Sequence, residues 1–410
     1  MSRITDEELS YNDVRESLKQ LGHKSLSNSS VVREQAKDQT EDQTFVPDNE
    51  AVAERDVGGH RQQMNLPDPG NNARFEVAGR EWPADDLSPS VCMWHDDKLA
   101  AFSVSIDDNH VDNHAYWLEL AANYGWRWTW FVITNNIGSD RDDWPQWQNL
   151  VNLGHDVQSH TCSHLCDGLF DIRKEYQISQ SQINNSLSSN QAITLAYPFG
   201  YETRKGGSPC ASVPTKNNRQ EAARRYIAAR DVVGALVSPA KMDFMKIPSM
   251  SELRNFFCDD CNWAFFDSLF DQNSRNYRSW YNAHLHHVGG SDLQAVIRQA
   301  FNHVRRREPS VWVGKFCDVA KYAQEYATAS IHNLRANETQ MTFDLHDEMN
   351  DRYFDFPLTI KIKLPSSWRG RFSSVQNNRE IENQTLSHHG QNYALVYAVP
   401  DKGRVMLRKG

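Results

Sequence analysis

The sequence predicts an α/β protein whose mostly parallel sheet follows a polar extension and precedes a small β-sandwich. From residue 98, short apolar segments typical of buried strands alternate with segments of helical periodicity, which favours a parallel sheet. After about residue 335 the helical pattern ends and apolar and polar residues alternate, as in antiparallel strands. Before residue 90 the composition is too polar to form a core of its own. The 410 residues leave room for this organisation.

Residues 1–90 are expected to form a largely disordered N-terminal extension, since Asp, Glu and Gln dominate residues 38–44 and Pro, Gly and Asn gather at 66–72. Acidic residues such as Asp6 and Glu8, and the lack of an apolar core, exclude a secretory signal in the first twenty residues. No stretch approaches the roughly 18 apolar residues of a membrane span, so a cytoplasmic location is the default expectation. The net charge of −9, without a basic block, argues against a nucleic-acid partner.

The middle of the chain contains the strands and helices of the predicted sheet. We expect strands over residues 100–106, 126–134, 156–158, 192–197, 226–230, 279–286 and 312–315. Helices are expected over residues 113–124, 145–153, 292–306 and 317–329, and Gly154 ends the second of them.

Two histidines four residues apart, His160 and His164, are the first sign of a metal site. On a helical turn this spacing places both imidazoles on one face, with Cys162 pointing away. The spacing alone is common by chance, but a pair of adjacent carboxylates, Asp107 and Asp108, ends a predicted strand and offers the third ligand. Two imidazoles and one carboxylate leave a position open for water, which is typical of a hydrolytic site rather than a closed structural one. Zinc is the default ion for such ligands, and other first-row divalent ions remain open.

The chain around these residues resembles the polysaccharide deacetylases of carbohydrate esterase family 4, the NodB homology domain. The similarity lies in residues 100–108, which end in Ser-Ile-Asp-Asp, in residues 154–164 with the two histidines, in residues 195–200, in residues 280–288 and in residues 311–322. It covers roughly residues 95–330, so we place the deacetylase domain at 91–332. The resemblance implies a distorted, incomplete (β/α) barrel (NodB-like), in which the chemistry collects at the carboxyl ends of the strands.

The resemblance also implies an activity and a metal centre. Members of this family remove acetyl groups from carbohydrates, either N-acetyl from an amino sugar or O-acetyl from a xylan-like chain. An acetylated carbohydrate is therefore the expected substrate partner, and a divalent ion, by default Zn²⁺, is the expected cofactor. By the same resemblance Asp108, His160 and His164 would hold the ion.

The remaining catalytic roles follow from the same motifs. Asp107 matches the family's catalytic base, and His286 matches the general acid that protonates the leaving group. The backbone N–H of Phe199 occupies the position that completes the oxyanion hole, where Tyr is common. His284 shares a strand face with His286 and is expected to lie deeper in the barrel, satisfied by hydrogen bonds.

One position departs from the family pattern. Many relatives have an Arg two residues before the proline of the third motif, where it pairs with the catalytic Asp, and this chain has Ala196 there. Arg230, at the end of an apolar strand and followed by Asp231, is the predicted replacement partner of Asp107, because its planar fork pairs bidentately with a carboxylate. The alternative is a structural salt bridge from Arg230 to Asp231 or to a neighbouring acid.

Two other functions stay open beside a metal-dependent deacetylase. A C–N hydrolase of small cyclic amides can use the same fold, but such relatives often lack part of the metal set, and this chain has all three ligand positions. A catalytically inactive carbohydrate-binding protein predicts the loss of Asp107 or His286, and both are present. The expected substrate-facing loops, which carry no motif, do not name the sugar, and the oligomeric state is open. Cys258 and Cys261 are expected to be two free thiols or one local disulfide.

The C-terminal part is predicted to be a small β-sandwich over residues 335–410. Residues 341–345, 358–364, 393–397 and 405–408 alternate apolar and polar side chains, with a hairpin turn at 400–403. Such a domain either binds carbohydrate or packs against the barrel as a structural extension. The second role is favoured, because no row of exposed aromatic residues is evident.

Overall fold

The computed structural model describes residues 79–139, 141–165, 171–200, 215–239, 242–251 and 263–410. The expectations for residues 1–78, for Cys258 and Cys261, and for parts of the substrate-facing loops lie outside these residues. Two compact units are distinguished: one comprises Gln63–Val288 with Ala300–Gly410, and the described part of the other is Gly289–Gln299. Among the described residues, every helix is too short or too polar to cross a bilayer.

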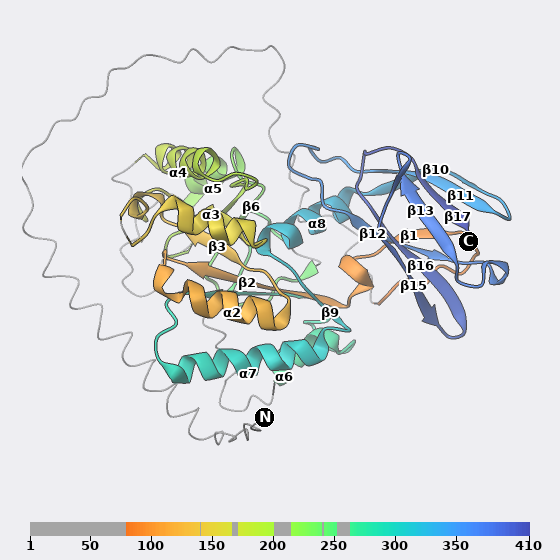
Figure 1. Ribbon diagram of the computed structural model, residues 1–410, viewed down its shortest axis with the longest axis horizontal. Helices are drawn as coiled ribbons and strands as arrows, with labels where there is room; N and C mark the ends of the chain where they lie inside the picture. The colour runs from red at the N-terminus through yellow and green to blue at the C-terminus, as the bar shows by residue number, and fades with distance from the viewer. Residues whose placement is uncertain (1–78, 140, 166–170, 201–214, 240–241, 252–262) are drawn as a thin grey trace, which may run out of the picture. The chain divides into compact units, whose positions relative to one another are not determined.

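A curled sheet of parallel strands forms the first part of the larger unit (Figure 1). Its order is β6-β5-β4-β3-β2-β8-β7, and β9 also pairs with β2. The strands are β2 (Ala100–Asp107), β3 (Thr129–Val132), β4 (Asp156–Ser159), β5 (Thr194–Ala196), β6 (Ala228–Arg230), β7 (Met250–Ser251), β8 (Trp280–Leu285) and β9 (Val311–Val313).

The two edges of this sheet approach each other without closing into a full barrel. Ile247, which precedes β7, forms a parallel bridge with Arg230 at the end of β6. Backbone hydrogen bonds on both sides of that bridge join Ala229 to Ile247 and Ile247 to Asp231. The α/β architecture with an incomplete barrel is therefore confirmed.

Helices follow most of the strands, and local sequence signals set their ends. The helices are α2 (His114–Tyr124), α3 (Trp144–Asn152), α4 (Ile172–Ser186), α5 (Thr215–Ala223), α6 (Ala264–Asp267), α7 (Ser291–Arg307) and α8 (Phe316–Thr328), with short 3-10 turns at Val111–Asn113 and Thr134–Asn136. Asp143 caps α3 by accepting a hydrogen bond from the N–H of Gln146. Gly125 ends α2 in the left-handed region, which glycine adopts without strain. Strand β2 is buried on both faces, as expected of a parallel strand inside such a domain.

The C-terminal part consists of two antiparallel sheets. One has the order β1-β12-β16-β15 and the other β10-β11-β17-β13-β14. Their strands are β1 (Pro89–Val91), β10 (Ser330–Ala336), β11 (Gln340–His346), β12 (Leu358–Lys363), β13 (Phe372–Gln376), β14 (Arg379–Glu380), β15 (Asn383–His388), β16 (Gln391–Ala398) and β17 (Val405–Lys409). The predicted antiparallel C-terminal architecture is confirmed, and the structure adds β1, which comes from before the barrel.

The two parts of the larger unit share one core. Side chains of α8 such as Phe316 and Tyr322 belong to the same buried cluster as Phe343 and Ile360 of the antiparallel sheets. A buried lysine reinforces this joint, since Lys361 Nζ lies 2.6 Å from Asp97 Oδ2. The segment before the barrel and the C-terminal sheets thus pack together against the parallel sheet.

Candidate active site

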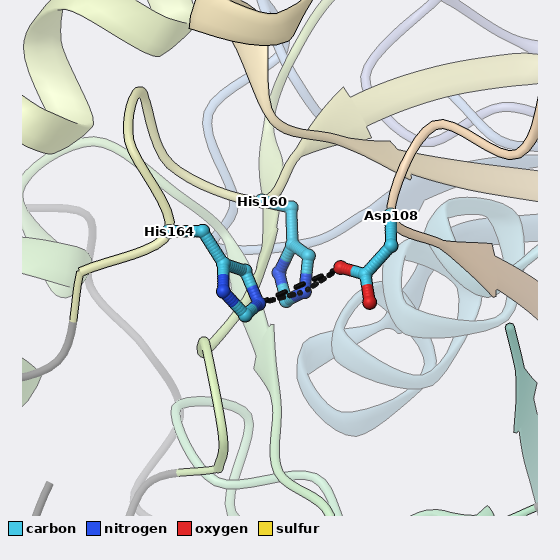
Figure 2. Close-up of side chains that lie close together, drawn as sticks. All are labelled: Asp108, His160 and His164. Atoms are coloured by element: carbon cyan, nitrogen blue, oxygen red, sulfur yellow. Dashed lines mark hydrogen bonds and ion pairs between the residues drawn. The ribbon is translucent and has the colours of Figure 1, made fainter. Parts of the chain in front are cut away.

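Three side chains converge at the carboxyl edge of the parallel sheet and form what we call the ligand cluster: Asp108, His160 and His164 (Figure 2). Asp108 Oδ1 lies 3.4 Å from His160 Nε2 and 3.5 Å from His164 Nε2. The two Nε2 atoms are 3.2 Å apart. Among the described residues, this is the one group of at least three His, Cys, Asp or Glu side chains whose ligand atoms lie close enough to hold an ion.

The neighbours of His160 leave its Nε2 atom available as a ligand. His160 Nδ1 lies 2.9 Å from the carbonyl oxygen of Ala196, which can only accept a hydrogen bond. The Nδ1 atom therefore carries the proton, and the lone pair is on Nε2, facing Asp108. This arrangement, in which a second hydrogen bond fixes the tautomer of a histidine, is the usual support of a metal-binding imidazole.

Residues with left-handed backbone conformations shape the cluster. Asp108 has a φ of 66° directly after the end of β2, so its side chain turns toward the same site as that of Asp107. This turn resolves the geometric problem of two adjacent carboxylates, because consecutive residues of a regular strand point to opposite faces. Such conformations cost free energy in non-glycine residues and concentrate at functional sites.

The segment that carries the two histidines is not a helical turn, so the predicted local conformation is wrong. It is an irregular loop after β4, in which Thr161 and His164 have φ values of 68° and 54°. The i to i+4 spacing still brings the imidazoles together because the loop folds back at Thr161, whose hydroxyl accepts a hydrogen bond from the N–H of His164 at 3.0 Å. Cys162 points away from the cluster, as predicted, and its thiol lies 3.2 Å from Asn135 Oδ1.

Two polar residues that the sequence analysis missed anchor these loops. Glu175 of α4 accepts hydrogen bonds from the N–H groups of Cys162 and Ser163, at 3.1 and 2.8 Å. Asn109 accepts from the N–H of Ile133 at 2.7 Å and donates to Asp142 at 2.9 Å. A mostly buried carboxylate in the first turn of a helix was the available signal for Glu175, but its partners come from a loop, and only the fold reveals them.

The pKa shifts in the ligand cluster favour the protonation states that bind a metal ion. Burial lowers the pKa of His164, and the neighbouring imidazole of His160 lowers it further, to about 4, so its imidazole is neutral at pH 7. Burial alone would raise the pKa of Asp108, but the imidazoles of His160, His286 and His164 around it bring that pKa well below its usual range. A neutral imidazole and an ionised carboxylate are the protonation states that bind a metal ion.

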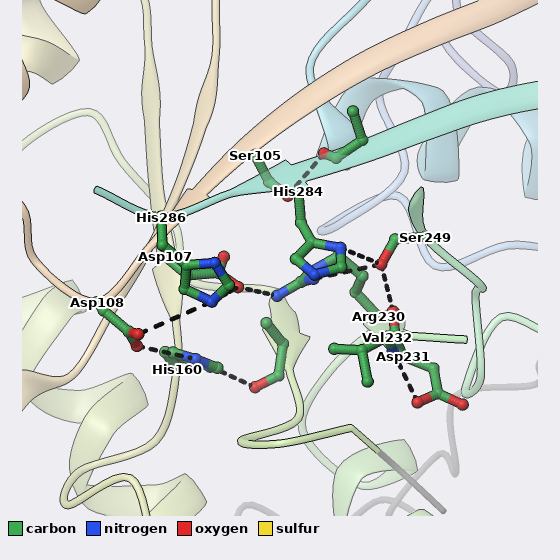
Figure 3. Close-up of polar contacts among 12 residues, drawn as sticks. Ser105, Asp107, Asp108, His160, Arg230, Asp231, Val232, Ser249, His284 and His286 are labelled. Atoms are coloured by element: carbon green, nitrogen blue, oxygen red, sulfur yellow. Dashed lines mark hydrogen bonds and ion pairs between the residues drawn. The ribbon is translucent and has the colours of Figure 1, made fainter. Parts of the chain in front are cut away.

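Asp107 lies behind the cluster and is paired with Arg230, which donates from Nη2 to its Oδ2 atom (Figure 3). Both side chains are almost completely buried, with 2% of Asp107 and 0% of Arg230 exposed. The structure thus brings the two predicted partners together. Asp231, the alternative partner, instead accepts a hydrogen bond from the N–H of Val232 at 2.7 Å. The second oxygen of Asp107, Oδ1, is buried without a hydrogen-bond partner.

His286 lies on the open side of the same carboxylates. Its Nε2 atom is 3.9 Å from Asp107 Oδ2 and 3.8 Å from Asp108 Oδ2, and 39% of its side chain is exposed. The loop after β8 is tied to the loop after β2 by Asn113, which accepts from the N–H of Val288 at 2.6 Å. His287 points away and pairs with Asp112 at 3.0 Å.

Phe199 borders the cluster on its other side. Its φ of 60° and 42% exposure place the residue at the surface of the site, and its ring lies 4.6 Å from the ring of His164. The following turn requires glycine, because a Cβ atom on Gly200 would lie 2.4 Å from Val232 and its φ is 89°. Phe199, the residue of the predicted oxyanion donor, is thus beside His164, one of the predicted metal ligands.

Comparison with known proteins connects this site to a family. Residues 96–208, which include β2, Asp107, Asp108 and both histidines, match the model of the polysaccharide deacetylase family. These residues are therefore similar to a polysaccharide deacetylase domain, as the resemblance of the motifs predicts. Polysaccharide deacetylases are hydrolases of amide or ester bonds, which is the enzyme class that the motifs predict.

A known protein that matches most of this chain is named for an activity other than deacetylation. A gellan lyase from Bacillus sp. is 32% identical over 379 residues, which are 84% of this chain. The chain spans 14% of the length of that protein. The matched portion is thus a small part of a much longer enzyme.

Two solved structures are similar to this chain at lower sequence identity. The Xyl-CE4 domain of a multidomain xylanase from the hindgut metagenome of Trinervitermes trinervoides is 16% identical, with a TM-score of 0.35 over 54% of this chain and 89% of that one. PuuE allantoinase is 13% identical, with a TM-score of 0.39 over 59% of this chain and 97% of that one.

Proposed function

We propose that this chain is a metal-dependent deacetylase that hydrolyses N-acetyl or O-acetyl groups of a carbohydrate. The observation that carries the proposal is the ligand cluster, with the buried Asp107–Arg230 pair behind it and His286 beside it. Hydrolysis of an unactivated amide or ester needs a nucleophilic water, a base, a stabiliser for the oxyanion and an acid for the leaving group. The neighbouring residues offer a candidate for each.

The ligand cluster fits a divalent ion in two respects. Its three ligand atoms are 3.2, 3.4 and 3.5 Å apart. A tetrahedral ion with bonds of about 2.0–2.1 Å holds its ligands about 3.3 Å from one another, so the spacing suits zinc and ions of similar size. In addition, Asp108 Oδ1 is buried and has no hydrogen-bond partner, which is costly for a carboxylate unless a cation lies beside it.

When bound, such an ion supplies Lewis-acid chemistry, because it makes water a nucleophile at neutral pH and polarises the acyl carbonyl. Asp107 takes the proton of the attacking water through Oδ1, the oxygen that Arg230 leaves unoccupied. Arg230 pairs with this carboxylate and fixes its orientation. The backbone N–H of Phe199 donates to the oxyanion that forms when the water oxygen bonds to the acyl carbon.

His286 completes the reaction as the general acid. It lies within 4 Å of both carboxylates and is open to solvent on its other side, so it faces the position of the leaving group. Its proton passes to the amine nitrogen or the alkoxide oxygen as the bond to the acyl carbon breaks. The products are acetate and the deacetylated sugar.

The proposal is tested by acetate release from acetylated sugars, with and without a chelator. The panel contains N-acetylated glucosamine oligomers, acetylated xylan and, because of the name of the long relative, gellan carrying acetyl groups. We expect acetate from at least one of them, loss of activity on chelation, and recovery with Zn²⁺ or another first-row ion. Chelator-resistant activity would contradict the metal dependence. Turnover of small cyclic amides alone would support the C–N hydrolase, and binding without turnover an inactive carbohydrate-binding protein.

A further inference from the structure

Asp107 belongs to a set of polar side chains that we call the buried network. Its members are Asp107, Arg230, Ser249 and His284 (Figure 3). Arg230 Nη1 lies 3.3 Å from Ser249 Oγ, and Ser249 Oγ lies 2.7 Å from His284 Nδ1. Ser249 also donates to the carbonyl oxygen of Asp231, at 2.5 Å. All four side chains are buried, Ser249 completely. Four elements contribute one residue each: β2, β6, the segment before β7, and β8.

The direction of each hydrogen bond around Ser249 follows from what its partners can do. A serine hydroxyl has one proton and can accept two hydrogen bonds. The Asp231 carbonyl only accepts, so the proton of Ser249 points to it. Ser249 must then accept from Arg230 Nη1–H and from His284 Nδ1–H, which fills its capacity and fixes His284 with its proton on Nδ1.

The guanidinium of Arg230 depends on these contacts for its position. Its Nη2 group donates to Asp107 and its Nη1 group to Ser249, whereas its Nε group is buried without a hydrogen-bond partner. The carbon of the guanidinium lies 5.3 Å from the centre of the Phe131 ring, a contact that attracts the cation but does not orient its fork. Removing Ser249 Oγ would leave a second buried N–H group of this cation unpaired, and such a group shifts or recruits water.

We infer that Ser249 is a positioning residue for the catalytic base: it orients Arg230 against Asp107, and His284 holds Ser249 in turn. The inference rests on the proposed function, in which Asp107 is the base. The other charged or titratable groups near Asp107 are Asp108 next to it in the chain, His286 at the end of β8 and His164 of the ligand cluster. Because all of these remain when Ser249 is replaced, a change in Asp107 can be assigned to Arg230.

The test compares Ser249→Ala with Ser105→Ala. Ser105 is a matched control, since it is also a completely buried serine of the same sheet with one hydroxyl hydrogen bond, to the carbonyl of Ala283 at 3.2 Å. For Ser249→Ala we expect kcat to fall by up to about 10-fold, no more than the loss expected for Arg230 itself, with KM little changed. Its metal content should equal that of the wild type, and Ser105→Ala should retain the wild-type kcat. Equal kcat values in the two variants would overturn the inference.

Two further measurements keep the inference testable. If Ser249→Ala does not fold, His284→Gln leaves the hydroxyl in place and should give a smaller loss of kcat with KM unchanged; an unchanged kcat would contradict the inference. If the wild type deacetylates nothing, the proposed function fails, and ¹⁵N NMR of labelled histidines decides about the network. The His284 Nδ1–H resonance, assigned with the His284→Gln variant, should be protected from solvent exchange and should be lost in Ser249→Ala. A His284 protonated on Nε2 alone would refute the arrangement.

Discussion

The two halves of the site are built in different ways. The ligand cluster comes from the end of β2 and one loop after β4, and it is partly open, with 30% of the Asp108 side chain exposed. The buried network comes from four separate elements and is closed to solvent. The ligand cluster is shaped by strained loops, where Asp108, Thr161 and His164 have positive φ values. The buried network is carried by residues at or near the ends of regular strands.

This difference suggests that the ligand cluster and the buried network have separate functions. An ion needs an open coordination position and an approach for water and substrate, so its ligands must lie at the surface of the sheet edge. A carboxylate base needs a fixed orientation and a stable charge, which a buried cation supplies because the attraction is stronger away from water. Variants of the two halves should therefore fail in different ways, and the predictions below separate metal loss from loss of base function.

The largest effect is expected for His160→Ala. Two remaining ligands seldom hold an ion, so the variant should lose bound metal together with the water activation and oxyanion stabilisation that the ion supplies, on the order of 10⁴-fold in kcat/KM or more. Metal analysis of the purified protein checks the first point. The matched control is His332→Ala, which removes an exposed imidazole from β10 and should retain full occupancy. A His160→Ala protein with wild-type metal content would break the assignment of the ligand cluster.

Asp107→Asn should show the opposite combination. Asn has nearly the same shape but cannot take a proton, so we expect metal content to stay at the wild-type level and kcat to fall about 10²- to 10⁴-fold, the usual contribution of a general base. Activity and metal content are measured on the same preparation. Loss of metal in this variant would show that the two halves are not separable in the way that their geometry suggests.

The sequence predicts the ligand cluster better than the buried network for a physical reason. His160 and His164 are four residues apart and Asp107 and Asp108 are adjacent, so short-range spacing and family motifs are enough to find them. Arg230 was identified because it ends an apolar strand, and strand ends meet at one edge of a parallel sheet. Ser249 carries no such signal: it is a single serine whose partners lie 18 to 35 residues away, and they meet only when the sheet curls.

The predictions of helices and strands are likewise limited to features that a local sequence pattern can indicate. Most of the parallel strands, helices α2, α3, α7 and α8 and the antiparallel C-terminal part follow from hydrophobic periodicity, which burial of one or both faces imposes. Helices α4, α5 and α6 and strand β7 were not predicted. The helical turn at 160–164 was wrong because periodicity says nothing about left-handed residues, and here Thr161 and His164 both adopt that conformation. The place of β1 in the C-terminal sheet was also missed, because a strand of three residues, Pro89–Val91, has too short a pattern to recognise.

His286→Ala tests the open side of the site, and its effect should depend on the substrate. The acid matters most when the leaving group is a poor one, so we expect a loss of about 10²-fold on an acetylated sugar and little loss on an activated aryl acetate. His287→Ala is the control, since it removes the adjacent, exposed imidazole that pairs with Asp112, and both rates should remain near those of the wild type. Equal losses of His286→Ala on both substrates would count against its role as the acid.

The smallest change in rate is expected for Arg230→Gln, which keeps an amide near Asp107 but removes the cation. The amide can donate one hydrogen bond to Asp107 but cannot keep the geometry that the guanidinium imposes, so kcat should fall while KM changes little. The variant should remain within about 10-fold of the wild type, with full metal content. A wild-type kcat would leave Ala196 without a replacement and this pairing without a catalytic role.

The free energy of unfolding provides an independent test of the Asp107–Arg230 pair. Removing one partner of a buried ion pair leaves an uncompensated charge and typically costs about 3–5 kcal/mol in the free energy of unfolding. Replacing both, as Arg230→Gln with Asp107→Asn, removes the uncompensated charge, so the double variant should unfold less readily than Arg230→Gln alone. Denaturant unfolding of the wild type, the two single variants and the double variant measures this coupling. Additive losses would show that Arg230 is held mainly by Ser249 and the Phe131 ring, and the buried network would then serve the fold rather than the base.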